Sequence, residues 1–361
     1  MTMAEDQIEN MRMLRDSASA VAPPGGGLGR IRGLRFTHPG FDPAVWRRMG
    51  EMGWIGLRVP EAAGGSGLGM SEFCALAEQL GAGLVPEPLV AGTMAARLLG
   101  DAVPSALLAG KRIIIPAWQE RADTIEPTAE ARLREGRVFG RKLFVPMAAG
   151  ADAFLVTTRD GLALVDTAAP GVSVEIASTQ DGGHWGTVSF AEAPAQLLPP
   201  SQPGLPADSL PDAIDEATLA TAAYLLGVME RGFELTLEFL RTRKQFGQAI
   251  GSFQSLQHRA ADLKIQIALT RASVESAAAT VDAGSPIVTR RAAVSRAKAR
   301  AADACLLVTR QAIQLHGGIG YTDEYDVGLY LRKAMVLANA YGSAQLHRAR
   351  FAALLPEDDD V

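Results

Sequence analysis

The chain has 361 residues, of which 48% are hydrophobic and 21% charged, and it carries a formal net charge of −5. This composition is typical of a globular protein and excludes a disordered chain, and the negative charge gives no reason to expect nucleic acid as a partner. The length exceeds the usual size of one hydrophobic core, so we expect two or three domains.

Targeting signals and cysteines indicate the compartment. The first fifteen residues carry mixed charges and no apolar run, which argues against a secretory signal. No uncharged apolar stretch approaches the roughly 20 residues that span a bilayer, so we expect a cytoplasmic protein without a membrane partner. Cys74 and Cys305 lie in apolar surroundings without Cys-x-x-Cys spacing. They are predicted to be buried thiols, with a disulfide as the alternative.

Residues 1–110 are predicted to form a helical domain. One helix is expected behind Asp42-Pro43, and others at 71–81 and 89–99. The apolar residues of the first of these would share one face: Val45, Trp46, Met49 and Met52. The glycine-rich stretch 64–69 lacks a preceding strand and fits neither GxGxxG nor GxxxxGK spacing, so we interpret it as a turn rather than a nucleotide loop.

Residues 111–205 change character. Short β-rich segments alternate with Gly, Asp and Pro turns, which predicts a small antiparallel sheet or barrel. Residues 197–211 contain five prolines and are expected to be a linker. From residue 206 to 361 the pattern is helical again, with helices expected at 212–243, 255–283, 286–316 and 326–354. Together these segments predict an α+β fold that ends in a four-helix bundle.

Two polar stretches interrupt the helical pattern of the bundle. Residues 241–254 read Arg-Thr-Arg-Lys-Gln-Phe-Gly-Gln-Ala-Ile-Gly-Ser-Phe-Gln, and residues 314–321 read Gln-Leu-His-Gly-Gly-Ile-Gly-Tyr. Arginine offers a fork of donors suited to phosphate, and glycine lets a ligand approach the backbone closely. Each stretch alone could be a solvated helix end or a plain turn. Because both occur at ends of bundle helices, we interpret them as a ligand site.

These stretches resemble the signatures of the acyl-CoA dehydrogenase family of flavoproteins. Residues 241–254 and 314–325 match its C-terminal motifs, and Trp46 with 52–57, 59–61 and 64–65 is typical of its N-terminal domain. The resemblance implies a helical domain, a small β domain and a four-helix bundle, with FAD as cofactor and an acyl-CoA thioester as substrate. The residues it implies at the FAD are Arg243, Gln245, Phe246, Phe253, Gln254, Gln314, Gly317, Gly318, Ser343 and Gln345.

In the family, the counterparts of Arg243 and Phe246 reach the flavin of a neighbouring subunit. The catalytic base that removes the α-proton is, in most members, a glutamate whose position here is Tyr341. A phenol with a pKa near 10 is a poor base for that step. Some relatives place the glutamate on the first bundle helix instead, at the position of Ala217, and Glu216 or Asp215 beside it is then the candidate.

The segments that contact the flavin ring from the same chain also depart from the family pattern. The usual Thr-Glu-Pro-x-x-Gly-Ser-Asp loop is replaced by residues 116–123, Pro-Ala-Trp-Gln-Glu-Arg-Ala-Asp. The usual Trp-Ile-Thr/Ser is replaced by residues 144–146, Phe-Val-Pro, and proline has no N–H to offer. Contacts to the chain's own flavin are therefore expected to be lost, whereas contacts to a neighbour's flavin persist.

This asymmetry resembles the smaller subunit of the α2β2 bacterial acyl-CoA dehydrogenases of steroid side-chain breakdown. It implies a homologous larger subunit as partner and electron-transfer flavoprotein as electron acceptor. Two alternatives stay open, namely a self-sufficient homo-oligomer with Glu216 or Asp215 as base, and a flavin-free scaffold on the same fold. The five histidines lie too far apart for a metal site, and the basic residues of 290–300 spread around a helix as a solvated face would.

Overall fold

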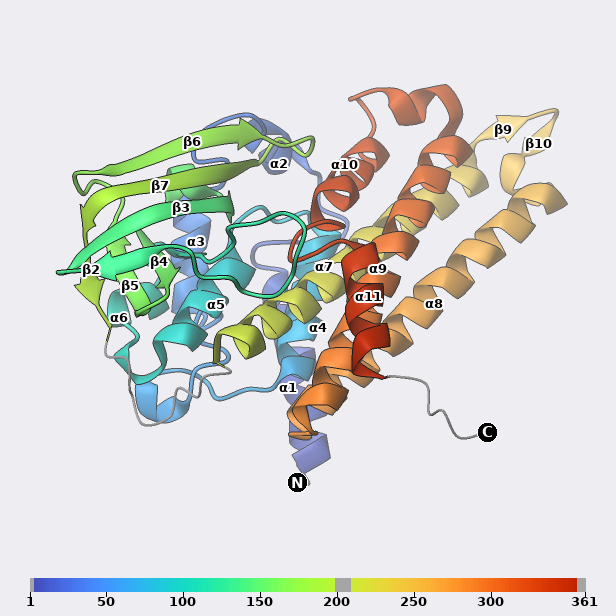
Figure 1. Cartoon of the computed structure of the whole chain (residues 1–361). Coiled ribbons are helices and arrows are strands. Elements are labelled where there is room, and N and C mark those ends of the chain that lie inside the picture. Colours follow the sequence, from blue (N-terminus) through green and yellow to red (C-terminus); the bar gives the residue numbers. More distant parts are fainter. Residues whose placement is uncertain (1–2, 199–208, 356–361) are drawn as a thin grey trace. The chain divides into compact units, whose positions relative to one another are not determined.

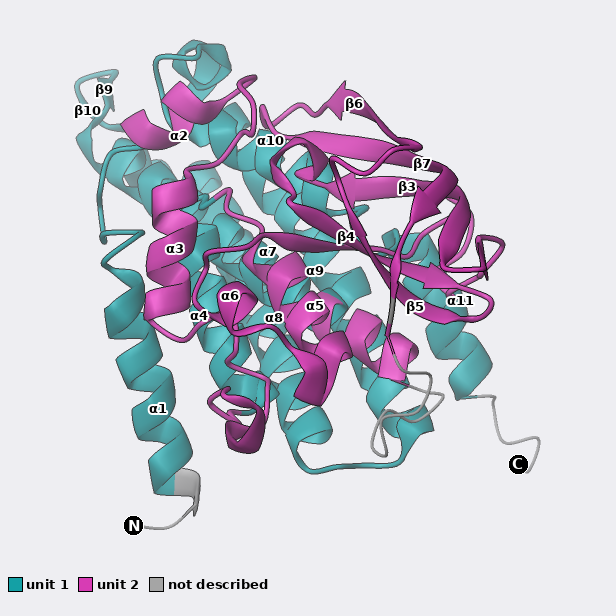
Figure 2. Ribbon diagram, turned by 90° about the vertical axis from the view of Figure 1, so that its left-hand side faces the viewer, with its two compact units in different colours: residues 1–28, 69–85, 218–361 teal, residues 29–68, 86–217 magenta. Residues whose placement is uncertain are grey.

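The computed structural model describes residues 3–198 and 209–355, which form two compact units. A helical unit comprises Met1–Leu28, Gly69–Val85 and Thr218–Val361, and a mixed unit comprises Gly29–Leu68 and Pro86–Ala217 (Figure 2). The N-terminal helices thus contribute to both units. The division into domains 1–110, 111–205 and 206–361 remains a prediction, and its second boundary lies outside the described residues.

The helical unit is organised around one central helix (Figure 1). Its helices are α1 (Met3–Ala18), α4 (Met70–Ala82), most of α7 (Ser209–Thr242), α8 (Gln254–Asp282), α9 (Ile287–His316), α10 (Val327–Leu337) and α11 (Ala344–Leu354). Helix α9 packs against α8, α10 and α11, and eight of its seventeen buried residues are alanine. Small side chains let neighbouring helix axes approach closely, so this alanine-rich sequence suits the central position.

Helix α4 crosses α7 at glycines. A Cβ atom at Gly227 would lie 1.8 Å from the carbonyl oxygen of Glu78, so only glycine permits this approach. The Glu78 carboxylate and that of Glu230 each lie 2.7 Å from the guanidinium of Arg271 on α8. Burial raises the pKa of Glu230, while Arg271 opposes that rise. This ion-pair network joins α4, α7 and α8.

The mixed unit contains short helices and two four-stranded sheets. Its helices are α2 (Gly29–Leu34), α3 (Pro43–Glu51), α5 (Leu89–Leu99) and α6 (Ser105–Leu108). The first sheet has the order β1 (Ile114–Ala117), β4 (Ala153–Thr158), β5 (Gly161–Asp166), β8 (Gln196–Leu197). The second has the order β2 (Arg132–Arg134), β3 (Arg137–Pro146), β7 (His184–Pro194), β6 (Val172–Ser178). Every residue of β4 is buried, so this strand forms the centre of the unit.

The described residues also contain short 3₁₀ helices: η1 (Glu61–Ala63), η2 (Gly100–Ala102), η3 (Ala148–Gly150), η4 (Ile250–Ser252) and η5 (Gly317–Tyr321). The glycine-rich stretch 64–69 follows η1 and packs back on its own chain, since a Cβ at Gly65 would lie 2.1 Å from the carbonyl oxygen of Val59. That contact confirms the turn interpretation.

Several expectations are confirmed. Helix α5 has the bounds predicted for 89–99, and α3 begins behind Asp42, whose side chain accepts a hydrogen bond from the Ala44 N–H at 2.8 Å. Trp46 and Met49 are fully buried. Both cysteines are buried thiols. None of the helices in the described residues is long and apolar enough to cross a membrane.

Three expectations were wrong in detail. The first sheet is not purely antiparallel, because β1 pairs with β4 in parallel; β2 and β3 lie between them in sequence and supply the crossover that a parallel pair needs. The helix predicted over 326–354 is two helices, α10 and α11, because Tyr341 and Gly342 adopt left-handed backbone and Ser343 caps a new helix. Helix α7 begins three residues before the predicted 212, and most of the predicted linker, 199–208, lies outside the described residues.

Candidate functional site

The stretch after α7 forms a tight hairpin. Strands β9 (Lys244–Gln245) and β10 (Gln248–Ala249) pair antiparallel and are joined by Phe246 and Gly247 alone. Both joining residues have positive φ, 53° and 82°, which is the backbone of a type I′ turn. Asn or Asp usually occupies the first position, so a phenylalanine there is strained. Phe246 is 90% exposed, so this turn places an apolar ring largely in solvent.

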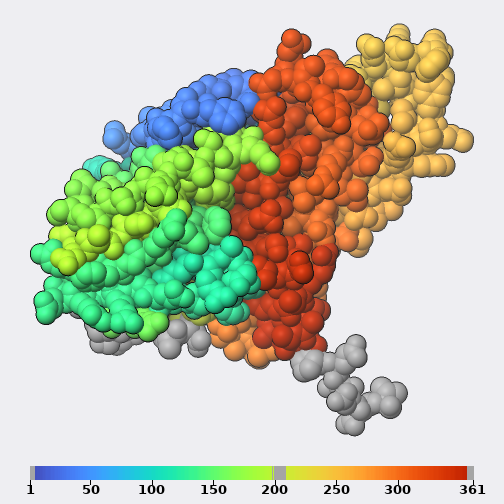
Figure 3. All heavy atoms as spheres, turned by 45° about the horizontal axis from the view of Figure 1, so that its top comes forward, coloured from blue at the N-terminus to red at the C-terminus, as the bar shows by residue number. Residues whose placement is uncertain are grey.

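The base of this hairpin is cationic. Arg241, Arg243 and Lys244 are all exposed, and no carboxylate of residues 3–198 or 209–355 pairs with any of them. Figure 3 shows the corner between α7 and α8 in yellow, projecting from the helical unit beside the orange atoms of its later helices. An exposed guanidinium without an internal partner is available to a phosphate oxygen.

Phe253 and Gln254 lie directly behind the hairpin. The ring of the half-buried Phe253 meets that of Phe246 edge to face, with centroids 6.1 Å apart. Gln254 is exposed and begins α8. The hairpin residue Gln245 is exposed as well. All five predicted FAD residues in 241–254 therefore occur at one corner of the helical unit.

The second stretch ends α9. Gly317 terminates the helix with φ 65° and ψ −143°, a conformation that favours glycine. A Cβ placed on Gly317 or on Gly318 would meet nothing within 4 Å, so the backbone there borders open space. Gln314 is exposed on the last turn of α9. A ligand can approach this backbone as closely as the glycines allow.

An aromatic cluster brings the two stretches together. The ring of Phe239 on α7 stacks on His316 at the end of α9, with centroids 4.5 Å apart. Tyr325 packs against both rings, at 4.9 Å from His316 and 6.1 Å from Phe239. The Phe239 carbonyl also accepts the backbone N–H of Arg243 at 2.8 Å. Sequence reasoning missed Phe239, for which the signal was its position one helical turn before Arg243, and it included Tyr325 only as the last residue of the matched stretch 314–325.

The turn between α10 and α11 carries the remaining predicted residues. Ser343 is the N-cap of α11, its hydroxyl accepting the Leu346 N–H at 3.3 Å, and Gln345 is exposed. Tyr341 has φ 55° and is half-buried. Burial raises the pKa of its phenol above the usual value near 10. The group at the family's usual base position thus holds its proton even more tightly than a free tyrosine.

Glu216 is held by two arginines of the mixed unit. Its carboxylate accepts from Arg58 at 2.9 Å and 3.2 Å, and Arg97 lies 3.6 Å away. The side chain is 13% exposed. Its neighbours Asp215 and Ala217 are both buried. Both oxygens of this carboxylate accept hydrogen bonds from Arg58. The carboxylate is therefore better suited to an ion pair that holds α7 in place than to accepting a proton.

The first part of the segment in place of the family's ring-contact loop, residues 116–118, is buried in the mixed unit. Lys142 is completely buried, and its ammonium donates to the Glu120 carboxylate at 2.6 Å and to the Thr157 hydroxyl at 2.9 Å. Trp118 is 7% exposed. Pro146, at the end of β3, has no N–H. Glu120 of this segment is thus engaged inside the unit, whereas Arg121 and Asp123 are exposed and pair with each other at 2.7 Å.

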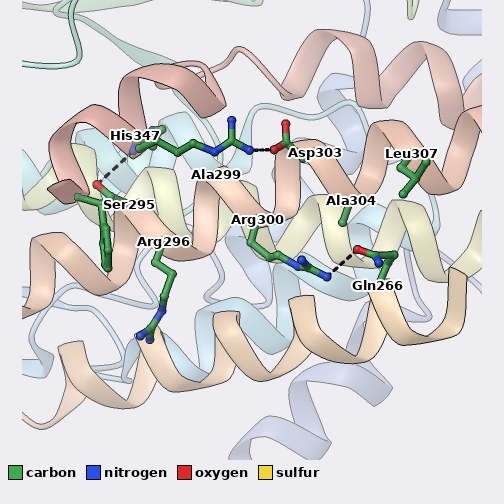
Figure 4. Close-up of a pocket in the computed structure, with 11 residues that line it drawn as sticks. Gln266, Ser295, Arg296, Ala299, Arg300, Asp303, Ala304, Leu307 and His347 are labelled. Atoms are coloured by element: carbon green, nitrogen blue, oxygen red, sulfur yellow. Dashed lines mark hydrogen bonds and ion pairs between the residues drawn. The ribbon is translucent and has the colours of Figure 1, made fainter. Parts of the chain in front are cut away.

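A cavity of about 330 Å³ lies among α8, α9 and α11 (Figure 4). Gln266, Arg300 and His347 are among its lining residues, and none of the predicted FAD residues lines it. In the parts of the chain that the structure describes, His, Cys, Asp and Glu side chains form no cluster that could hold a metal ion.

The sequence matches two family models, Acyl-CoA dehydrogenase, N-terminal domain, over residues 9–101 and Acyl-CoA dehydrogenase, C-terminal domain, over residues 211–355. It is 31% identical over 339 residues to acyl-CoA dehydrogenase IpdE2 of Mycolicibacterium smegmatis, with 94% of each chain covered. The counterpart IpdE2 of Mycobacterium tuberculosis is 32% identical over 348 residues, covering 94% of this chain and 93% of the relative.

Among solved structures, the fold resembles the steroid ACAD Tcur3481–Tcur3483, with a TM-score of 0.84, 30% identity and 99% of each chain covered. It also resembles the ChsE4–ChsE5 complex of Mycobacterium tuberculosis, with a TM-score of 0.85, 28% identity and 97% and 98% covered. These comparisons confirm the resemblance drawn from the motifs, and the cofactor of this family is FAD. The chain belongs to the acyl-CoA dehydrogenase family of FAD-dependent oxidoreductases.

Proposed function

We propose that this chain is a subunit of a heteromeric acyl-CoA dehydrogenase, completes the FAD site of a homologous larger subunit and lacks a catalytic base of its own. The observation that carries the proposal is the strained hairpin, which holds Phe246 and the unpaired Arg243 in solvent. A strained turn that leaves most of an aromatic ring exposed costs stability, which favours a role for this ring in contact with another molecule.

The residues available to the cofactor fit one part of it. Arg243 would pair with a phosphate of the flavin, and Phe246 would lie against a ring, while the open backbone at Gly317 and Gly318 leaves room for a ligand. When bound, FAD supplies the hydride acceptor of the desaturation. Because the hairpin projects into solvent, the flavin that it contacts would be bound by a neighbouring chain. The same fit therefore supports an oligomer.

The residues of this chain are poorly suited to supply the catalytic base and the flavin-ring contacts. Tyr341 keeps its proton, and Glu216 is engaged by Arg58 and Arg97. The segment that would contact the chain's own flavin ring instead directs Glu120 at the buried Lys142. We infer that the base and the ring contacts come from the larger subunit, in an α2β2 arrangement.

The substrate class and the acceptor are part of the proposal. Similarity to the steroid ACAD Tcur3481–Tcur3483 supports an acyl-CoA with a steroid-derived acyl group, and the ChsE4–ChsE5 complex supports assembly from two different chains. Electron-transfer flavoprotein is the proposed acceptor. We also propose that the complex works in the cytoplasm.

The decisive measurement is FAD per chain, for this protein alone and after co-expression with candidate larger subunits. Alone it should be FAD-poor and inactive, and with its partner it should gain yellow colour and activity. In the complex, Arg243→Ala should weaken flavin binding roughly 10- to 150-fold, the range for losing a hydrogen bond to a charged group. Arg47→Ala, an exposed arginine of α3, is the matched control and should change nothing.

Stoichiometric flavin and full activity in the isolated protein would refute the proposal in favour of a self-sufficient enzyme. A complex whose flavin content ignores Arg243→Ala would point instead to a scaffold that contributes no cofactor contacts.

A further inference from the structure

Lys298 lies at the centre of the helical unit, on α9, and its side chain is completely buried. In the described part of the chain, no carboxylate lies within ion-pair distance of its ammonium. Its Nζ instead donates to two backbone carbonyls, those of Ala338 at 2.8 Å and Gly342 at 3.0 Å. Both carbonyls belong to the turn that joins α10 to α11.

A second buried side chain holds the same turn. His347 on α11 is 1% exposed, and its Nε2 donates to the carbonyl of Tyr341 at 2.9 Å. Its Nδ1 faces the hydroxyl of Ser295, 3.4 Å away on α9 (Figure 4). Burial, with Lys298 and Arg350 nearby, lowers the pKa of His347 to about 3. The ring is therefore neutral, with its proton on the nitrogen that faces the turn.

The turn needs such support because of its backbone. Tyr341 has φ 55° and Gly342 has φ 106°, and a non-glycine residue in left-handed backbone persists only where its surroundings impose it. Three of its carbonyls, at residues 338, 341 and 342, accept hydrogen bonds from side chains of α9 and α11. The backbone direction of the turn sets where Tyr341 points and where α11 begins at Ser343.

We propose that Lys298 and His347 form a turn clamp, a pair of positioning residues that fixes the backbone of residues 338–342 and thereby the placement of Tyr341, Ser343 and Gln345. A methionine would fill the same length without the cost of burying an ammonium. Packing alone would accept an apolar side chain at this position. The presence of a charged donor therefore indicates that the role of Lys298 is to donate hydrogen bonds to the two carbonyls. The link to catalysis rests on the proposed function, because Ser343 and Gln345 are proposed flavin contacts.

Desolvation is consistent with this placement. Burial lowers the pKa of Lys298 to about 7, while the charge of Asp303 opposes the fall. Both the ammonium and the neutral amine retain enough N–H groups to serve two carbonyls. The clamp therefore holds across neutral pH, whichever form is present.

Hydrogen exchange of the isolated chain tests the clamp without any flavin. In Lys298→Met the amides of residues 339–342 should exchange at least on the order of tenfold faster, since hydrogen bonds from a charged group are lost. Amides of 301–312 in α9 should keep their protection. Lys142→Met is the matched control, a fully buried lysine of the other unit, and should leave the turn unchanged. Unchanged exchange at 339–342 in Lys298→Met would overturn the proposal.

A second variant and a spectroscopic readout distinguish loss of the clamp from a general packing defect. If Lys298→Met fails to fold, His347→Phe, which fills the space without a donor, should still speed exchange at the turn; wild-type protection there would count against the clamp. Lys298→Arg keeps a cationic donor and should restore protection that methionine loses. In the complex with the larger subunit, Lys298→Met should alter the visible absorbance of bound flavin and Lys142→Met should not. A wild-type complex without flavin would refute the proposed function, while the exchange result would still decide the clamp.

Discussion

The buried pair of Lys142 and Glu120 allows a quantitative test of how the ring-contact segment is held. The ammonium lies 2.6 Å from the carboxylate, and the two side chains are 0% and 4% exposed. In Glu120→Gln the buried ammonium loses its counter-charge, and breaking such a pair costs about 3–5 kcal/mol. We expect about 3 kcal/mol, because the amide oxygen and the Thr157 hydroxyl at 2.9 Å remain as acceptors.

The same variant should become strongly pH-dependent. Burial lowers the pKa of Lys142, and Glu120 opposes that fall, so removing the carboxylate lowers the pKa further. The unfolded chain then binds more protons than the folded one from the folded-state pKa up to the ordinary lysine pKa of 10.5. Stability therefore rises with pH over this window, and the deficit of Glu120→Gln should shrink as the solution becomes alkaline.

Urea unfolding of the isolated chain at pH 7 and pH 9.5 measures both effects. The control is the double variant Glu120→Leu/Lys142→Met, which replaces the pair by apolar side chains and should recover most of the loss. A cost below about 1 kcal/mol for Glu120→Gln at pH 7 would mean that Lys142 is already neutral or solvated. A double variant as unstable as the single one would show that shape, not charge, dominates.

Three further predictions concern the site. Phe246→Asn should strengthen the hairpin, because asparagine tolerates left-handed backbone that costs other residues about 1–2 kcal/mol. The same variant should weaken flavin binding in the complex. Slower amide hydrogen exchange at 244–249 with unchanged flavin affinity would reject the ring contact. Glu216→Gln should lower stability by about 1–3 kcal/mol through lost charge-assisted bonds to Arg58 and leave the rate of the complex unchanged, whereas a general base would cost roughly 10²–10⁴-fold. Stability of the wild type relative to Lys298→Met should rise between pH 7 and 10, because the pKa of Lys298 falls to about 7 on folding; a flat difference would place its ammonium in solvent.

Sequence reasoning succeeded where local patterns dominate. The apolar periodicity of 89–99 and the Asp-Pro start at 42–43 reflect contacts within a helical turn or two, and both are found in the structure. The two polar stretches at 241–254 and 314–321 were recognisable because they contradict helical packing. The family followed from those stretches, and the comparisons confirm it.

What sequence reasoning could not supply depends on contacts between distant residues. The break between α10 and α11 is invisible in the helical pattern of 326–354, since Lys298, about forty residues earlier, helps to hold it. Likewise the stacking of Phe239 on His316 joins two motifs that lie far apart in the chain. The carboxylate of Glu216 was a candidate base by position, but only the structure places Arg58 against it.

The stretch at 241–254 and the segment at 116–146 use their polar residues in opposite ways. Glu120 and Lys142 turn inward and satisfy each other inside the mixed unit, so their loss should appear as lost stability of this chain alone. The Arg243 side chain has no carboxylate partner within the described chain, and Phe246 is 90% exposed in left-handed backbone, so their loss should weaken flavin binding in the complex without destabilising this chain. A protein that acted by itself would need the opposite distribution at its flavin ring. The stability effects at 120 and 142, rather than the binding effects at 243 and 246, are therefore the physical signature that separates a completing subunit from a self-sufficient dehydrogenase.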